Sequence, residues 1–101
     1  MAGNPYASTI DWDDITKINL SNTKISDVSM LGNVHTLDLN GCSKISDVSM
    51  LGNVYLLNLT KCKNIIDISM LCNVHTLKLW GCPNITDVSM LGNVNTLNLS
   101  Y

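Results

Sequence analysis

Residues 24–34 read KISDVSMLGNV, and the same eleven letters return at residues 44–54. Looser copies, NIIDISMLCNV and NITDVSMLGNV, occupy residues 64–74 and 84–94, which gives a period of 20 residues within a chain of 101. Self-similarity at a fixed period of roughly 20–50 residues is typical of repeat architectures, in which stacked units share one core. We therefore expect a solenoid, with each repeat forming one coil.

The composition argues against several classes of protein. The chain is 46% hydrophobic without any Phe, so its core must be aliphatic. The net charge is −2, and the six basic residues are scattered lysines, which argues against a nucleic-acid-binding protein. No apolar run approaches the roughly 18 residues of a membrane-spanning helix, so we expect no membrane association. The start, MAGNPYASTIDWDD, lacks the basic and apolar regions of a secretory signal, which predicts an intracellular, cytoplasmic protein.

The spacing of apolar residues sets the register of each coil. In one coil these residues are Val34, Leu37, Leu39, Cys42, Ile45, Val48 and Leu51. The single step of two, Leu-x-Leu, is typical of a strand, whereas the steps of three indicate a tight 3₁₀-like return. This predicts parallel strands near residues 17–21, 36–40, 56–60, 76–80 and 96–100. We expect a solenoid over residues 15–101, about four and a half coils with an incomplete C-terminal one. Residues 1–14 are expected to form a partial N-terminal cap.

The segments LDLNGCSKISDV (37–48) and LKLWGCPNITDV (77–88) share the pattern L-x-L-x-x-C-x-x-I-x-D-V. This pattern resembles the leucine-rich repeat in its cysteine-containing form. The short return is similar to the compact repeats of large DNA viruses and protists, and more distantly to those of internalins. The resemblance implies a right-handed leucine-rich-repeat solenoid, of the α/β class by convention. It also implies a parallel sheet on a concave face that binds other proteins.

Three cysteines, Cys42, Cys62 and Cys82, share one column of the repeat. Their spacing of 20 residues is unlike the short spacing of zinc ligands, and three equivalent thiols cannot all pair in disulfides. We interpret them as reduced, buried side chains that hold the turn after the strand. The fourth, Cys72, replaces a glycine of its own column. We expect no metal site and no cofactor.

Two further polar columns are interpreted as turn residues. In the acidic column, each carboxylate is expected to accept a bond from nearby backbone, rather than to bind calcium. In the asparagine column, the residues are expected to turn the chain back into the strand in left-handed geometry. The acidic column consists of Asp27, Asp47, Asp67 and Asp87, and the asparagine column of Asn33, Asn53, Asn73 and Asn93.

His35 and His75 share a column but lie two coils apart, with Tyr55 between them. At about 4.8 Å per coil they are about 10 Å apart, which is too far to share a metal ion. A pH-sensing or partner-contacting role is the alternative. The methionines at 30, 50, 70 and 90 are interpreted as flexible packing on the convex side.

The positions that vary between coils are the outward positions of the predicted strands. Trp80, together with Leu56 and Tyr55, is typical of residues that anchor an interface. The alternative is that Trp80 only covers the backbone of its neighbours. The predicted protein-binding residues are Thr36, Asp38, Asn40, Tyr55, Leu56, Asn58, Thr60, Thr76, Lys78 and Trp80.

These patterns predict a non-enzymatic module that binds another protein. We find no nucleophile beside a matched base and no glycine-rich phosphate loop. The alternative is a structural or self-associating fragment of a larger protein, because Leu97 and Leu99 have no following coil to cover them. Such a fragment could be the substrate-recognition arm of a ubiquitin ligase, since cysteine-containing repeats often accompany an F-box.

Overall fold

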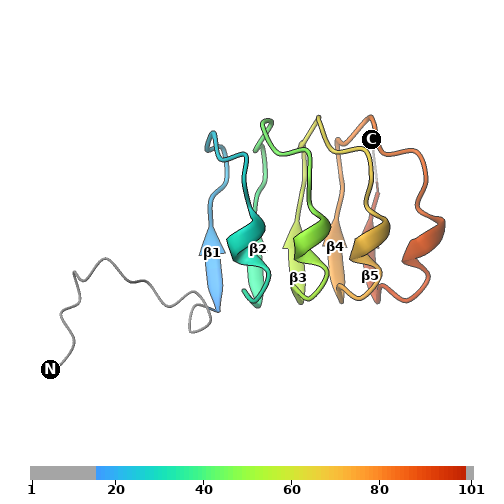
Figure 1. Cartoon of the computed structure of the whole chain (residues 1–101). Coiled ribbons are helices and arrows are strands. Elements are labelled where there is room, and N and C mark those ends of the chain that lie inside the picture. The colour runs from blue at the N-terminus through green and yellow to red at the C-terminus, as the bar shows by residue number, and fades with distance from the viewer. Residues whose placement is uncertain (1–15, 100–101) are drawn as a thin grey trace, which may run out of the picture.

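The computed structural model describes residues 16–99, which form a solenoid of five short strands alternating with four single-turn 3₁₀ helices (Figure 1). The strands stand side by side in sequence order in one parallel sheet, as predicted, and the 3₁₀ turns line the opposite side (Figure 1). The predicted N-terminal cap lies outside the described residues. In chain order the elements are β1 (Lys17–Asn19), η2 (Ser29–Leu31), β2 (Thr36–Asp38), η3 (Ser49–Leu51), β3 (Leu56–Asn58), η4 (Ser69–Leu71), β4 (Thr76–Lys78), η5 (Ser89–Leu91) and β5 (Thr96–Asn98).

The register of the sheet keeps the columns of the repeat together. Leu37 of β2 pairs with Leu57 of β3, which pairs with Leu77 of β4. The strands are three residues long, shorter than predicted, because the chain turns after them. The backbone ladder nevertheless continues beyond the strands, since the N–H of Gly41 donates to the carbonyl of Thr60 over 2.8 Å. Each side chain therefore has its counterpart from the next coil as its neighbour.

The predicted inward residues make the core. Leu37, Leu57 and Leu77 are fully buried, together with the thiol column and the apolar residues of the returns. At the two ends of the described stack the equivalent residues are only partly buried, because a coil covers them on one side alone. These residues include Ile18, Leu20, Ile25, Val88, Val94, Leu97 and Leu99.

The returns are short because each needs only one 3₁₀ turn. In η3, the N–H of Leu51 donates to the carbonyl of Val48 over 3.0 Å, and Gly52 follows in right-handed geometry with φ of −63°. The helices in the described part of the chain are all of this kind, and none is long and apolar enough to cross a membrane.

The predicted left-handed asparagine column is wrong. Among residues 16–99, positive φ values occur at Asn22, Gly41, Lys61 and Gly81, each the third residue after the end of a strand. The chain leaves each 3₁₀ turn in right-handed geometry, so the asparagines that follow it need no left-handed conformation. The sharp turn lies instead at the other end of the strand. The asparagines concerned are Asn33, Asn53, Asn73 and Asn93, which are all exposed.

Candidate functional site

The outward residues of the strands share one surface, which we call the sheet face. It is formed by the side chains that alternate with the buried leucines of β1–β5, and in β2–β4 these side chains are half-buried or exposed. Six of the predicted binding residues lie side by side on it. These are Thr36, Asp38, Leu56, Asn58, Thr76 and Lys78.

Two of these six residues also hold the turns that end their strands. The Asp38 carboxylate accepts a hydrogen bond from the backbone N–H of Asn40 over 3.0 Å. The side-chain oxygen of Asn58 accepts one from the N–H of Thr60, also over 3.0 Å. Lys78, in the same column, has no acceptor atom and cannot make this contact, and its side chain is exposed.

Asn40, Thr60 and Trp80 form the next outward column, at the end of the strands where the turn begins. The ammonium of Lys61 lies 5.2 Å from the centroid of the Trp80 ring, a distance at which cation and ring attract each other. Lys61 has a left-handed backbone, with φ of 62°, at the position that Gly41 and Gly81 hold in neighbouring coils. The sequence prediction omitted Lys61, although its alignment with two glycines was visible.

At the other end of the strands, three rings stack into one column, which we call the aromatic column. The ring of Tyr55 lies between those of His35 and His75, with centroids 4.7 and 4.4 Å away and interplanar angles of 18° and 9°. The Nδ1 atoms of the histidines lie 2.8 and 2.9 Å from the hydroxyl oxygens of Thr36 and Thr76 respectively. These bonds fix the orientation of both rings.

Tyr55 is one of the predicted binding residues, whereas His35 and His75 are not. The separation of the two histidines argues against a shared metal ion, but the ring of Tyr55 between them contacts both. Their shared repeat position was the signal. Among residues 16–99, no three His, Cys, Asp or Glu side chains gather as metal ligands would.

The thiol column has the structural role that was predicted. The thiols of Cys42, Cys62 and Cys82 donate to the carbonyl oxygens of Leu20, Leu39 and Leu59, over distances of 3.0, 3.1 and 3.0 Å. Each bond ties a turn to the strand end of the preceding coil. Burial raises the pKa of the Cys62 thiol to about 12, and burial also raises that of Cys82. Neutral, buried thiols of this kind are poor nucleophiles and poor metal ligands.

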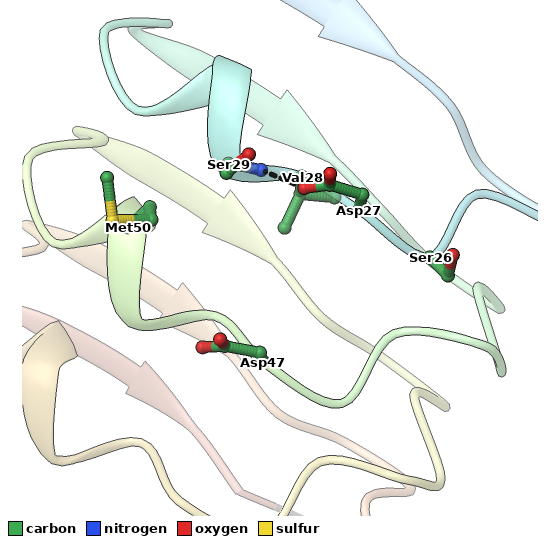
Figure 2. Close-up of a pocket in the computed structure, with 6 residues that line it drawn as sticks. All are labelled: Ser26, Asp27, Val28, Ser29, Asp47 and Met50. Carbon is green, nitrogen blue, oxygen red and sulfur yellow. Dashed lines mark hydrogen bonds between the residues drawn. The ribbon is translucent and has the colours of Figure 1, made fainter.

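The acidic column caps the returns, also as predicted. The carboxylates of Asp27 and Asp47 accept the N–H groups of Ser29 and Ser49 over 3.0 and 2.9 Å, and these backbone bonds hold the pKa of both carboxyls below their ordinary value. Figure 2 shows these two aspartates in adjacent returns, beside a pocket of about 230 Å³ that Met50 also lines. Each carboxylate thus has its own serine as partner.

The methionine column lies in the 3₁₀ turns on the side opposite the sheet, where it was predicted. Met30, Met50, Met70 and Met90 are between 47% and 59% exposed, so they add little to the buried core. The step of three places the preceding Val48 and the following Leu51 inward, which leaves the methionine between them facing solvent. Packing in the returns therefore rests on the branched residues.

Two solved structures are similar to this chain. An internalin (inlF) from Listeria monocytogenes matches over 88% of the chain with a TM-score of 0.69 and 31% sequence identity. An internalin C2 (inlC2) from the same species matches over 87% with a TM-score of 0.52 and 23% identity, which bears on the fold alone. The chain spans 29% of the first and 53% of the second. No protein-family model and no curated protein matches the sequence.

Proposed function

Since the chain is a leucine-rich-repeat protein, we propose that it is a non-enzymatic module that binds another protein through the sheet face. The fold supports the general role, because leucine-rich repeats commonly mediate protein–protein interaction. The proposed contact residues are those of the sheet face, the aromatic column and the rim formed by Asn40, Thr60, Lys61 and Trp80.

One observation supports the sheet face as the surface that binds the partner. The returns repeat almost letter for letter, whereas the outward strand positions differ between coils and lie together on one surface. Positions that only build the scaffold must satisfy the same environment in each coil, so they converge on one residue. A surface that recognises a partner has no such requirement, and varied residues there favour recognition.

The chemistry of the remaining residues supports a non-enzymatic role. The buried thiols donate to backbone carbonyls, and the carboxylates of the returns accept bonds from their own serines. The pocket between the returns is lined by these turn residues and Met50 (Figure 2). A cytoplasmic location is part of the proposal and rests on the free thiols.

Site-specific photo-cross-linking in cells tests the proposal. A photoreactive amino acid is placed at Lys78 on the sheet face or, as a matched control, at Lys44 where the return begins; both side chains are exposed. We expect a discrete adduct with another protein from position 78 and none from position 44. Adducts from position 44 alone would assign binding to the opposite side.

A second candidate function, self-association, is favoured by the last described strand. Leu97 and Leu99 are only partly buried, whereas their counterparts Leu77 and Leu79 are buried. Among residues 16–99, β5 is an edge strand of the sheet, and an edge strand can template another strand. If this surface drives assembly, the mass of the 101-residue chain in sedimentation should rise with concentration. A constant monomer mass would contradict it.

A further inference from the structure

Resting on the proposed function, we infer that the partner presents an acidic, extended segment to the sheet face. This segment runs along the strands from the aromatic column to the Lys61–Trp80 pair. Three properties of the surface support this chemistry: its charge, the hydrogen-bonding atoms of the aromatic column, and the distance between its two ends.

The described charges are distributed unevenly around the coil. The sheet face and its rim carry Lys17, Lys61 and Lys78 against a single carboxylate, Asp38. The returns carry four aspartates, each already bonded to a serine, and the turns that lead into the returns carry Lys24, Lys44 and Lys63. None of the three lysines of the sheet face and its rim makes an ion pair with another described residue. The sheet face with its rim therefore carries a net positive charge and the return side a net negative one, which favours an acidic partner on the sheet face.

Lys61 and Lys78 come from adjacent coils and stand near the same end of the strands. The Lys61 side chain is positioned by its contact with Trp80, which follows β4 directly after Leu79. Lys78, the last residue of β4, is exposed. A carboxylate that contacts both ammonium groups would lie near Trp80, and tryptophan is enriched among the residues that dominate the binding energy of protein interfaces.

The aromatic column offers hydrogen-bond donors at the opposite end. The Nδ1 atoms of His35 and His75 lie within hydrogen-bond distance of threonine hydroxyls. When the hydroxyl donates to Nδ1, the proton of the neutral imidazole is on Nε2, which can then donate outward to a carbonyl or carboxylate oxygen. Stacking against Tyr55 holds both rings in place before binding, so little conformational entropy is lost on association.

The spacing of the two ends indicates an extended ligand. Tyr55 precedes β3 and Thr60 follows it, so the surface between the aromatic column and the rim is one strand long. At about 3.3 Å per extended residue, a segment of about five or six residues spans it. Two rows of outward side chains lie between the ends. Thr36, Leu56 and Thr76 carry no charge, and the next row carries the carboxylate of Asp38 at one side and the ammonium of Lys78 at the other, so an acidic peptide would lie toward Lys78.

A defined peptide pair tests the inference. The probe is a fluorescein-labelled peptide of alternating glutamate and tyrosine, about eight residues long. Its control has glutamine in place of glutamate. We expect fluorescence polarisation to detect binding of the glutamate peptide that is at least about tenfold tighter than that of the glutamine peptide at low salt, and that weakens as salt is raised.

Matched charge reversals locate the site. The variant Lys61→Glu/Lys78→Glu should weaken binding of the glutamate peptide by about tenfold or more, whereas Lys24→Glu/Lys44→Glu, with the same change in net charge, should leave it within about twofold. All four lysines are exposed, so each variant should keep its unfolding transition, which circular dichroism verifies. Equal losses in the two double variants, or equal binding of the two peptides, would overturn the inference.

The cross-linking experiment separates this inference from the function on which it rests. An adduct from position 78 without binding of the glutamate peptide would leave protein binding in place and refute the acidic partner. Binding of the peptide that Lys61→Glu/Lys78→Glu abolishes, with no adduct from position 78 in cells, would support the chemistry of the surface and refute its use as a protein-binding face.

Discussion

Gly52 and Gly92 hold the same position of the repeat, directly after a 3₁₀ turn, but have different surroundings. A Cβ atom on Gly52 would lie 2.6 Å from the carbonyl oxygen of Met70 in the next return, closer than real Cβ contacts. A Cβ on Gly92 would meet nothing within 4 Å. Both glycines have ordinary right-handed φ values, −63° and −59°. Replacing each by alanine therefore isolates the effect of coil-to-coil packing.

The size of the effect follows from two terms. Alanine in place of a right-handed glycine stabilises a protein by about 0.4–1 kcal/mol, because it restricts the unfolded chain. This term is common to both variants. In Gly52→Ala the new methyl must displace the Met70 backbone, and overpacking of this kind costs about 1–3 kcal/mol. The two variants should thus differ by about 1–3 kcal/mol in free energy of unfolding.

Thermal and urea unfolding of both variants measure this difference. Gly92→Ala should unfold at a slightly higher temperature than the wild type, and Gly52→Ala below Gly92→Ala by about 4–8 °C for each kcal/mol. If both substitutions stabilise the chain equally, the neighbouring returns are not packed as closely as the Gly52–Met70 approach indicates.

Three further predictions concern the core, the thiols and the acidic column. Leu57→Ala, at a fully buried position, should lower the free energy of unfolding by about 2–5 kcal/mol. Lys78→Ala, at an exposed position, should lower it by less than about 0.5 kcal/mol. Equal losses of the two variants in urea unfolding would contradict the register. Ellman's reagent should modify the half-buried Cys72 in the native protein and Cys62 only upon unfolding, because burial raises the Cys62 pKa to about 12. Rapid labelling of all thiols in the native protein would contradict the buried position of the thiol column. The folded pKa of Asp47 lies below its unfolded value, so the stability it contributes is present above about pH 4 and lost as pH falls through the folded pKa. Melting temperatures should therefore fall in that acidic range, and less steeply for Asp47→Asn.

The register and the core could be predicted from the sequence because steps of two and three allow few backbone conformations. Leu37 and Leu39 require a strand, and the three-residue steps that follow require tight turns, so the inward column was determined residue by residue. The left-handed turn was misplaced for a local reason. Asparagine tolerates that geometry, but its presence does not show whether the preceding 3₁₀ turn ends in right-handed geometry, as it does at Gly52.

The candidate site was predicted less completely than the core. The outward positions of the strands followed from alternation alone. The aromatic column did not, because His35, Tyr55 and His75 precede the strands, where alternation no longer applies. Whether three rings in successive coils stack or splay depends on their side-chain torsions, and the hydrogen bonds to Thr36 and Thr76 help to set these.

The repeat supplies an internal control for Lys61. Gly41 and Gly81 show which residue the turn accepts without strain, and Lys61 takes the same left-handed conformation at a cost of about 1–2 kcal/mol. Its contact with Trp80 stabilises the fold by about 0.5–1 kcal/mol at an exposed site, which offsets only part of this cost. Glycine at position 61 would therefore give a more stable scaffold. Asn22 holds this position in the first coil with φ of 60°, so the turn accepts residues other than glycine at this cost, and the stability that Lys61 forgoes fits its proposed role at the rim of the sheet face.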